Sequence, residues 1–245
     1  MTRVALVTGA AGGIGSATVT RLVDDGYAVV GVDLHDAPPG PTEGDRVVHV
    51  VGDVRDRAVL DAAVALAVER WGRLDAAVAA AAVIAGGRPL WETPDAELTE
   101  LLDVDVRGVW NTAAAAVPAM LGGPDPGGCR FVAIASAAGS YGLFHLSAYT
   151  AAKHAVVGLV KGLSADLVAT GVTAVAVSPG STRTAMLDAT AELYGVPDPA
   201  VFASNQLLRR VLEPDEVAAT IAFCCSVEGG VLNGGVVHAD GGFRP

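Results

Sequence analysis

A short apolar run near the amino terminus leads directly into a glycine-rich turn, and residues 4–15 read VALVTGAAGGIG. Helical spacing of apolar residues follows from Ile14 to Asp24, which places the turn between a predicted strand and a predicted helix. Glycines permit a tight turn and let the backbone approach a pyrophosphate at the helix amino end, where free N–H groups favour anions. A glycine-rich run alone could be a surface turn, but the strand–turn–helix context predicts a dinucleotide site. Its members are Gly9, Gly12, Gly13, Ile14 and Gly15.

Further apolar runs along the chain resemble the first one, and helical segments lie between most of them. Each run is nearly continuous in Val and Ala, which is typical of strands buried on both faces of a parallel sheet. The predicted strands are 4–7, 28–32, 47–51, 76–80, 131–135 and 172–177, and the predicted helices are 14–24, 58–71, 96–120, 148–169 and 215–226. This alternation predicts an α/β fold with three layers around a doubly wound parallel sheet.

The chain shows neither an interdomain linker nor an internal repeat. We therefore expect one domain over residues 1–245, with a cofactor half at about 1–130 and a catalytic half at about 131–245. Within the second half, the Ala, Leu, Met and Tyr content of residues 185–206 predicts a lid over an apolar site.

Composition excludes several classes of protein. The net charge of −11, from 16 basic and 27 acidic residues, opposes contact with a phosphate backbone, so nucleic acid is not an expected partner. No run approaches the ~18 to 20 apolar residues of a membrane span, and the first residues do not read as a secretory signal. We therefore expect a cytoplasmic protein without a membrane partner. The three cysteines, Cys129, Cys224 and Cys225, lack a metal-ligand spacing, so we expect reduced thiols and no metal site.

Acidic residues follow the second and third predicted strands. Asp33 lies about 20 residues beyond the glycine turn, where a carboxylate accepts hydrogen bonds from the adenosine ribose. That carboxylate would repel a 2′-phosphate, and Leu34 and its neighbours supply no Arg or Lys, so the sequence favours NAD over NADP. Asp53 and Val54 end the third strand and are candidates to contact the adenine, although a helix N-cap explains Asp53 equally well.

Tyr149 and Lys153 are four residues apart in a helical segment and therefore share one face of the helix. A lysine ammonium lowers the pKa of a nearby phenol, which lets the tyrosine exchange a proton with a substrate oxygen. Ser136 follows the predicted strand 131–135 at the edge where open α/β sheets bind ligands, so its hydroxyl could hold that oxygen. Tyr and Lys at this spacing often arise by chance, but the serine and the glycine turn together indicate a catalytic set.

These motifs resemble those of the short-chain dehydrogenase/reductase family over nearly the whole chain. The family patterns are TGxxxGxG, Ser…YxxxK, PGxxxT and DGG, and the matching positions are Thr8, Gly9, Gly13, Gly15, Ser136, Tyr149, Lys153, Pro179, Gly180, Thr184, Asp240, Gly241 and Gly242. The resemblance implies a seven-stranded Rossmann fold, a nicotinamide cofactor, and commonly a homotetramer built through the two long helices after the fourth and fifth strands. It also implies that the segment containing Pro179, Gly180, Thr182 and Thr184 holds the nicotinamide carboxamide.

The chain departs from the family pattern at two places. Residues 79–82 are four alanines where the family usually has Asn-Asn-Ala-Gly, so Ala80 and Ala81 would lie beside the cofactor without the usual amide. Asp105 stands where the family usually has the asparagine of its catalytic tetrad. An acid there could accept from a lysine-linked water that relays the proton, and its charge would also perturb Lys153 and Tyr149. A structural acid satisfied by backbone amides is the alternative.

The sequence therefore predicts an oxidoreductase that interconverts a secondary alcohol and a ketone, with Tyr149 as general acid/base, NAD as cofactor and a small apolar substrate. Residues 78–89, 91–94 and 107–112 also resemble an actinobacterial branch proposed to couple with the redox carrier mycofactocin while holding its nicotinamide tightly. The short connection at 33–46 speaks against that branch, whose members often carry an insertion there. A nicotinamide-binding sensor without catalysis is the alternative from another class.

Overall fold

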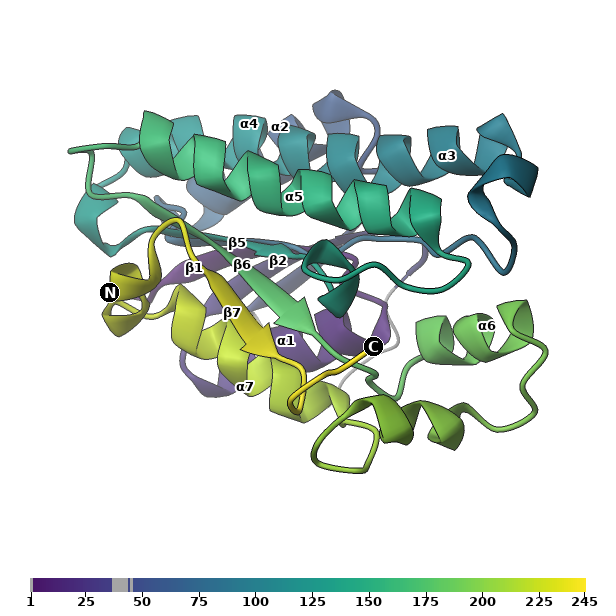
Figure 1. Ribbon diagram of the computed structural model, residues 1–245. Coiled ribbons are helices and arrows are strands. Elements are labelled where there is room, and N and C mark those ends of the chain that lie inside the picture. Colours follow the sequence, from purple (N-terminus) through teal and green to yellow (C-terminus); the bar gives the residue numbers. More distant parts are fainter. Residues whose placement is uncertain (1, 37–43, 45) are drawn as a thin grey trace.

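The computed structural model describes residues 2–36, 44 and 46–245, and its centre is a seven-stranded parallel sheet (Figure 1). The strands are β1 (Val4–Thr8), β2 (Ala28–Asp33), β3 (Val47–Val51), β4 (Ala76–Ala79), β5 (Arg130–Ile134), β6 (Thr173–Pro179) and β7 (Val236–Ala239). Their order is β3-β2-β1-β4-β5-β6-β7. The predicted doubly wound α/β fold is confirmed. Most of the connection between β2 and β3 (residues 37–43 and 45) lies outside the described residues.

The strand order reverses beside β1, which pairs with β2 on one side and β4 on the other. The chain first moves outward through β2 and β3, and then continues from β4 in the opposite direction. In open α/β sheets, ligands bind outside the carboxyl ends of the strands at such a reversal. The glycine turn follows β1 and therefore lies at this point.

Helices cover both faces of the sheet (Figure 1). One face packs against α2 (Arg57–Trp71), α4 (Gly108–Leu121) and α5 (Ser147–Asp166), and the other packs against α1 (Gly13–Asp24) and α7 (Pro214–Cys225). Side chains of β1 alternate between the two cores, since Val4 and Leu6 belong to the first and Ala5 and Val7 to the second. Burial on both faces explains why the strands read as continuous apolar runs.

The single helix predicted over residues 96–120 is wrong. The segment is divided into α3 (Asp95–Leu101), a π-helical turn η2 (Leu102–Arg107) and α4. The π turn contains Asp105, whose side chain it carries into the interior, where no part of the residue is exposed. π-helical turns inside helices often occur at functional sites, and hydrophobic spacing alone does not reveal them.

Other differences from the predicted elements are small. The helix predicted to end at residue 169 ends at Asp166, because the chain then turns through Ala169 and Gly171, both with positive φ. The sequence pattern assigned no range to β7, which is only four residues long. Residues 185–206 form α6 (Ala185–Leu193) and the 3₁₀ helix η5 (Pro199–Asn205), which lie apart from the main layers beyond the carboxyl ends of the strands (Figure 1).

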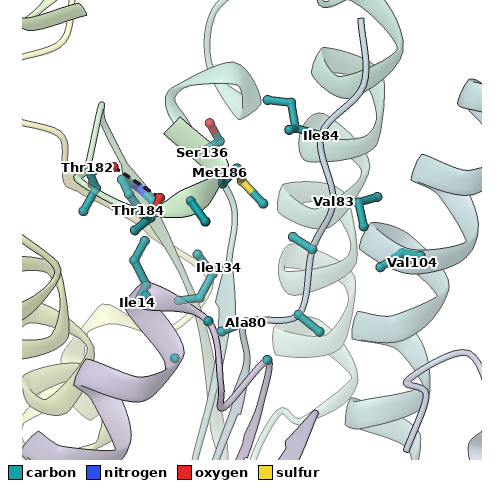
Figure 2. Close-up of a pocket in the computed structure, with 18 of the residues that line it drawn as sticks. Ile14, Ala80, Val83, Ile84, Val104, Ile134, Ser136, Thr182, Thr184 and Met186 are labelled. Atoms are coloured by element: carbon teal, nitrogen blue, oxygen red, sulfur yellow. Dashed lines mark hydrogen bonds between the residues drawn. The ribbon is translucent and has the colours of Figure 1, made fainter. Parts of the chain in front are cut away.

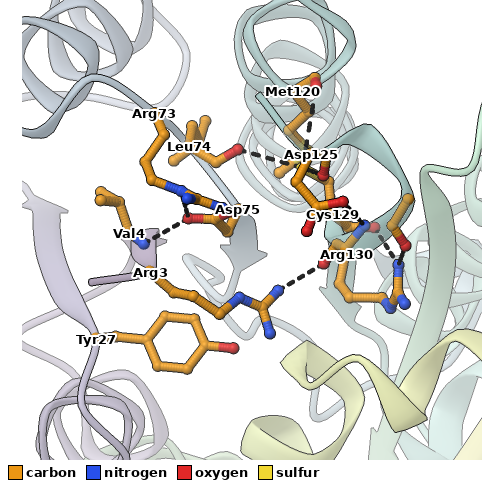
Figure 3. Close-up of polar contacts among 12 residues, drawn as sticks. Arg3, Val4, Tyr27, Arg73, Leu74, Asp75, Met120, Asp125, Cys129 and Arg130 are labelled. Carbon is orange, nitrogen blue, oxygen red and sulfur yellow. Dashed lines mark hydrogen bonds and ion pairs between the residues drawn. The ribbon is translucent and has the colours of Figure 1, made fainter. Parts of the chain in front are cut away.

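Polar side chains fasten the opposite, amino-terminal edge of the sheet (Figure 3). The Asp75 carboxylate accepts hydrogen bonds from the Val4 N–H group at 2.8 Å and from Arg73 Nε at 2.8 Å. Arg3 donates to the Gly128 carbonyl and lies over the Tyr27 ring. This network joins β1, β2 and β4 at the edge furthest from the glycine turn.

No helix within residues 2–36, 44 and 46–245 is long and apolar enough to cross a membrane. In the same part of the chain, no group of three His, Cys, Asp or Glu side chains is placed to hold a metal ion.

Candidate active site

A cleft of about 550 Å³ lies at the carboxyl edge of the sheet, where the strand order reverses. Of the residues expected from the sequence to form the site, all but one line this cleft. They are Gly9, Gly12, Gly13, Ile14, Gly15, Asp33, Leu34, Asp53, Val54, Ala80, Ala81, Ser136, Tyr149, Lys153, Pro179, Gly180, Thr182 and Thr184. Asp105 is the exception and lies behind Lys153.

The glycine turn forms a cradle that side chains would fill. Gly9 adopts a positive φ of 69°, and a Cβ on Gly15 would lie 1.9 Å from the Gly9 carbonyl oxygen. No side chain caps the amino end of α1, so its first N–H groups remain available to an anion. The turn therefore fits the pyrophosphate of a dinucleotide cofactor.

Thr8 compensates for the amide that the alanine run lacks. Its hydroxyl oxygen accepts hydrogen bonds from the Ala80 N–H group at 3.2 Å and from the Ala81 N–H group at 3.4 Å. These bonds tie the end of β1 to the end of β4. The backbone after β4 thus approaches Gly9 closely, since a Cβ on Gly9 would lie 2.7 Å from the Ala81 nitrogen.

The two acids on the adenosine side of the cleft differ in their partners. Asp33 accepts backbone hydrogen bonds from Ala11 at 3.0 Å and from His35 at 3.1 Å, so its carboxylate is held at the rim of the glycine turn. Asp53 instead pairs with Arg55, whose Nε lies 2.8 Å from Asp53 Oδ2, and this bond lowers the pKa of the Asp53 carboxyl. The helix N-cap role belongs to the neighbouring Asp56, which accepts from the Ala58 N–H group.

The segment after β6 closes the other end of the cleft. Thr184 caps α6, because its hydroxyl oxygen accepts a hydrogen bond from the Leu187 N–H group. A Cβ on Gly13 would lie 2.5 Å from Thr184 Cγ2, so the glycine turn and this segment are in close contact.

Ser136, Tyr149 and Lys153 converge at the inner end of the cleft. Ser136 follows β5. Tyr149 and Lys153 lie on α5, and both of these side chains are buried. Lys153 Nζ lies 5.5 Å from the centre of the Tyr149 ring and donates a hydrogen bond to the Ile134 carbonyl at 3.3 Å. The three side chains can therefore act on one substrate oxygen.

The pKa of Tyr149 lies above its ordinary value. Burial is the largest cause, the Asp105 carboxylate raises the pKa further, and the lowering effects of Lys153 and of a hydrogen bond with Ser136 do not offset them. The sequence predicted that Lys153 lowers the pKa of Tyr149, but not that this pKa is raised overall. A neutral phenol is the form that this environment favours.

Asp105 pairs directly with Lys153, and the distance between Oδ2 and Nζ is 3.1 Å. Its other oxygen, Oδ1, accepts a hydrogen bond from the Val83 N–H group at 2.8 Å. Burial acts to lower the pKa of Lys153, but the carboxylate offsets it, so that pKa is raised. Asp105 therefore bonds a backbone amide and also contacts Lys153 directly, while its role in a water-mediated proton relay stays a prediction.

The substrate side of the cleft has mostly apolar walls. Figure 2 shows Val83 and Ile84 on one side and Thr184 on the other, with Ser136 and Met186 between them. From the segment that precedes α5, Leu143 and Leu146 line the cleft. From the predicted lid, Ala185, Met186, Leu187 and Thr190 do so.

Sequence reasoning missed several contributors to the site. Thr8 carried a signal, since it belongs to the glycine motif, but its bonds to the alanine run could not be read from spacing. The Val83 N–H group and the Ile134 carbonyl act through the backbone, so their residue types give no indication of their roles.

Comparison with known proteins gave consistent matches along the chain. A family model described as enoyl-(acyl carrier protein) reductase matches residues 9–244. The short-chain reductase protein NovJ of Streptomyces niveus is 36% identical over 99% of this chain and 94% of its own length. An A-factor type gamma-butyrolactone 1′-reductase of Streptomyces virginiae is 34% identical over 98% of this chain and 95% of its own. The crystal structure of levodione reductase superposes with a TM-score of 0.88 at 28% identity, covering 98% of this chain and 96% of that one.

Proposed function

Because the chain belongs to the short-chain dehydrogenase/reductase family of oxidoreductases that bind nicotinamide cofactors, we propose that it interconverts a secondary alcohol and a ketone with NAD(H). The observation that carries the proposal is the convergence of Ser136, Tyr149 and Lys153 at the inner end of the cleft. Bound nicotinamide would supply or accept the hydride at the reacting carbon. The glycine turn would hold the pyrophosphate, and Thr182 and Thr184 would flank the nicotinamide.

Each polar side chain has a distinct task in this reaction. Tyr149 exchanges a proton with the reacting oxygen, and Ser136 holds that oxygen by a hydrogen bond. The Lys153 ammonium lies beside the phenol and acts to lower its pKa, while the Asp105 carboxylate acts to raise it. The apolar walls around Val83, Ile84 and Met186 exclude water and favour a substrate without charged groups.

Asp33 supports NAD as the cofactor. Its carboxylate is fixed at the rim of the glycine turn by two backbone hydrogen bonds, where it would accept from the ribose hydroxyls and repel a 2′-phosphate. The segment that follows offers Leu34, which is exposed, and not a basic side chain. The names of the relatives include reductases of cyclic compounds, so cyclic ketones are the first substrates to test.

The decisive experiment replaces Tyr149 with Phe. We expect Tyr149→Phe to reduce turnover of ketones by NADH at least about 10³-fold, within the range that general acid catalysis contributes. NAD affinity, measured by calorimetry, should stay within about twofold, since the ring is retained. Tyr141→Phe is the matched control, because the Tyr141 hydroxyl bonds Arg244 and does not line the cleft.

Three other outcomes would redirect the proposal. Substantial turnover by Tyr149→Phe would remove the tyrosine from its role. Purified protein that already carries nicotinamide and does not exchange it would favour the carrier-coupled reaction with mycofactocin. Saturable NAD binding without turnover of any alcohol or ketone would favour a nicotinamide sensor.

A further inference from the structure

The buried pair of Asp105 and Lys153 changes the charge that Tyr149 experiences. The carboxylate and the ammonium are both buried and their nearest atoms are 3.1 Å apart, so water screens their interaction very little. The Asp105 side chain is held from both ends, because Oδ1 accepts from the Val83 N–H group while Oδ2 faces Lys153. The pair is therefore fixed in place, and its net charge is zero.

Other ionisable groups around α5 do not take part in this pair. On the packed elements α3 and η2, Glu97 pairs with Arg88 and Asp103 pairs with Arg107, while Glu100 is exposed at the cleft. Arg130 lies at the far end of β5 and binds backbone carbonyls there. Among the described residues, the charged groups that act on the Tyr149 hydroxyl are thus Lys153 and Asp105, with Ser136 as its neutral partner.

We propose that Asp105 cancels the charge of the Lys153 ammonium and keeps Tyr149 protonated, so that the resting site is a proton donor suited to ketone reduction at neutral pH. Alcohol oxidation by the same site would require alkaline pH. This inference rests on the proposed oxidoreductase function, and it makes Asp105 a positioning residue that acts through Lys153.

Reduction and oxidation require different protonation states of Tyr149 at the start of the reaction. In reduction, the ketone gains a hydride at carbon, supplied by NADH, and a proton at oxygen from the Tyr149 hydroxyl, so the C=O π bond is replaced by C–H and O–H bonds. The phenolate that remains takes a proton from solvent. Oxidation needs the phenolate at the start, and a phenol whose pKa is raised by burial supplies little of it at neutral pH.

Spectroscopic titration tests the charge state without any substrate. The ultraviolet difference between the wild-type chain and Tyr149→Phe isolates the tyrosinate signal of Tyr149 from those of the other tyrosines. We expect this signal only at alkaline pH in the wild type, because burial raises the pKa of Tyr149. In Asp105→Asn, compared with Asp105→Asn/Tyr149→Phe, it should appear at least about one pH unit lower, because the ammonium is no longer neutralised.

Asp105→Asn is the appropriate change, because the side-chain oxygen of the asparagine can still accept a hydrogen bond from the Val83 N–H group. Asp103→Asn is the control, since Asp103 lies on the same π turn but pairs with Arg107 outside the cleft. It should leave the titration of Tyr149 unchanged. If Asp105→Asn fails to fold, the wild-type titration still decides, because a tyrosinate of Tyr149 at or below neutral pH would overturn the proposal.

The pH dependence of turnover gives the second test. With the wild type, we expect reduction to stay level between pH 6 and 8 and oxidation to rise about tenfold per pH unit, following the phenolate fraction. With Asp105→Asn, the oxidation rate should level off at a lower pH. Identical profiles for wild type and Asp105→Asn would overturn the inference. Absence of turnover alongside the expected titration would instead contradict the proposed function and leave the charge assignment standing.

Discussion

Asp33 shows how one side chain can determine the choice of cofactor. Its carboxylate is held between the N–H groups of Ala11 and His35, which fixes the charge at the point where the adenosine ribose would lie. Hydrogen bonds to a charged group contribute about 1.5–3 kcal/mol each, so a ribose that donates to Asp33 gains considerable affinity. A 2′-phosphate at the same place would meet a like charge.

We therefore expect Asp33→Ala to weaken NAD binding at least about tenfold, or ~1.4 kcal/mol, while NADP binding changes far less. Calorimetric titration with each cofactor measures both values. Asp36→Ala serves as the control, because Asp36 follows the same strand and is exposed. Equal losses for the two cofactors would remove Asp33 from the ribose site and leave it as a support of the glycine turn.

Sequence periodicity predicted most strands and helices. Strands buried on both faces are continuous runs of Val and Ala, and these differ clearly from the spaced apolar residues of a helix. Periodicity failed at η2, since a π turn depends on which backbone carbonyls pair and leaves the hydrophobic pattern of 96–120 nearly continuous. It also gave no range for β7, because His238 interrupts the short apolar run of that strand.

The site likewise contains features that the sequence reveals and features that only the structure shows. Side chains that form a spaced set together with other motifs, such as Ser136, Tyr149 and Lys153, could be singled out from the sequence. Contacts made by backbone groups could not, because every residue carries an N–H and a carbonyl. The pairing of Asp105 with Lys153 needed the structure, since 48 positions separate residues that the π turn brings to 3.1 Å.

Arg130 joins three elements at the amino-terminal edge of the sheet. From the first position of β5, its guanidinium donates to the carbonyls of Ser226 and Val227, just after α7, and to that of Gly127 in the 3₁₀ helix η3 (Pro126–Gly128). The side chain is buried, and burial lowers its pKa. Its removal would leave several carbonyls without partners in a region that water reaches poorly.

Each such carbonyl costs about 1–3 kcal/mol, so we expect Arg130→Met to lower the free energy of unfolding by about 3 kcal/mol or more. Urea unfolding followed by circular dichroism measures the change. Arg21→Met should cost less than about 1 kcal/mol, because the ion pair of Arg21 with Asp25 is exposed. Equal unfolding midpoints for the two variants would show that water replaces Arg130 at those carbonyls.

For the whole molecule, the outer surface of α3, η2 and α4 carries large apolar side chains. Trp110 is 61% exposed, Leu102 40% and Leu98 39%, and α4 lies on the outside of the helical layer beside α5 (Figure 1). Contiguous exposed apolar groups of this kind often mark a protein interface. We expect a second copy of the chain to cover this surface in a homotetramer or dimer.

Light scattering on a sizing column tests this expectation. The wild type should elute as a multiple of the 24.6 kDa chain, and Trp110→Glu should shift it to a smaller species. Val68→Glu on α2 is the control, since Val68 is 42% exposed on a neighbouring helix that we place outside the interface. Each chain carries a net charge of −11, so association works against electrostatic repulsion, and the larger species should gain population as salt screens that charge. A monomeric wild type at both low and high salt would contradict the assembly.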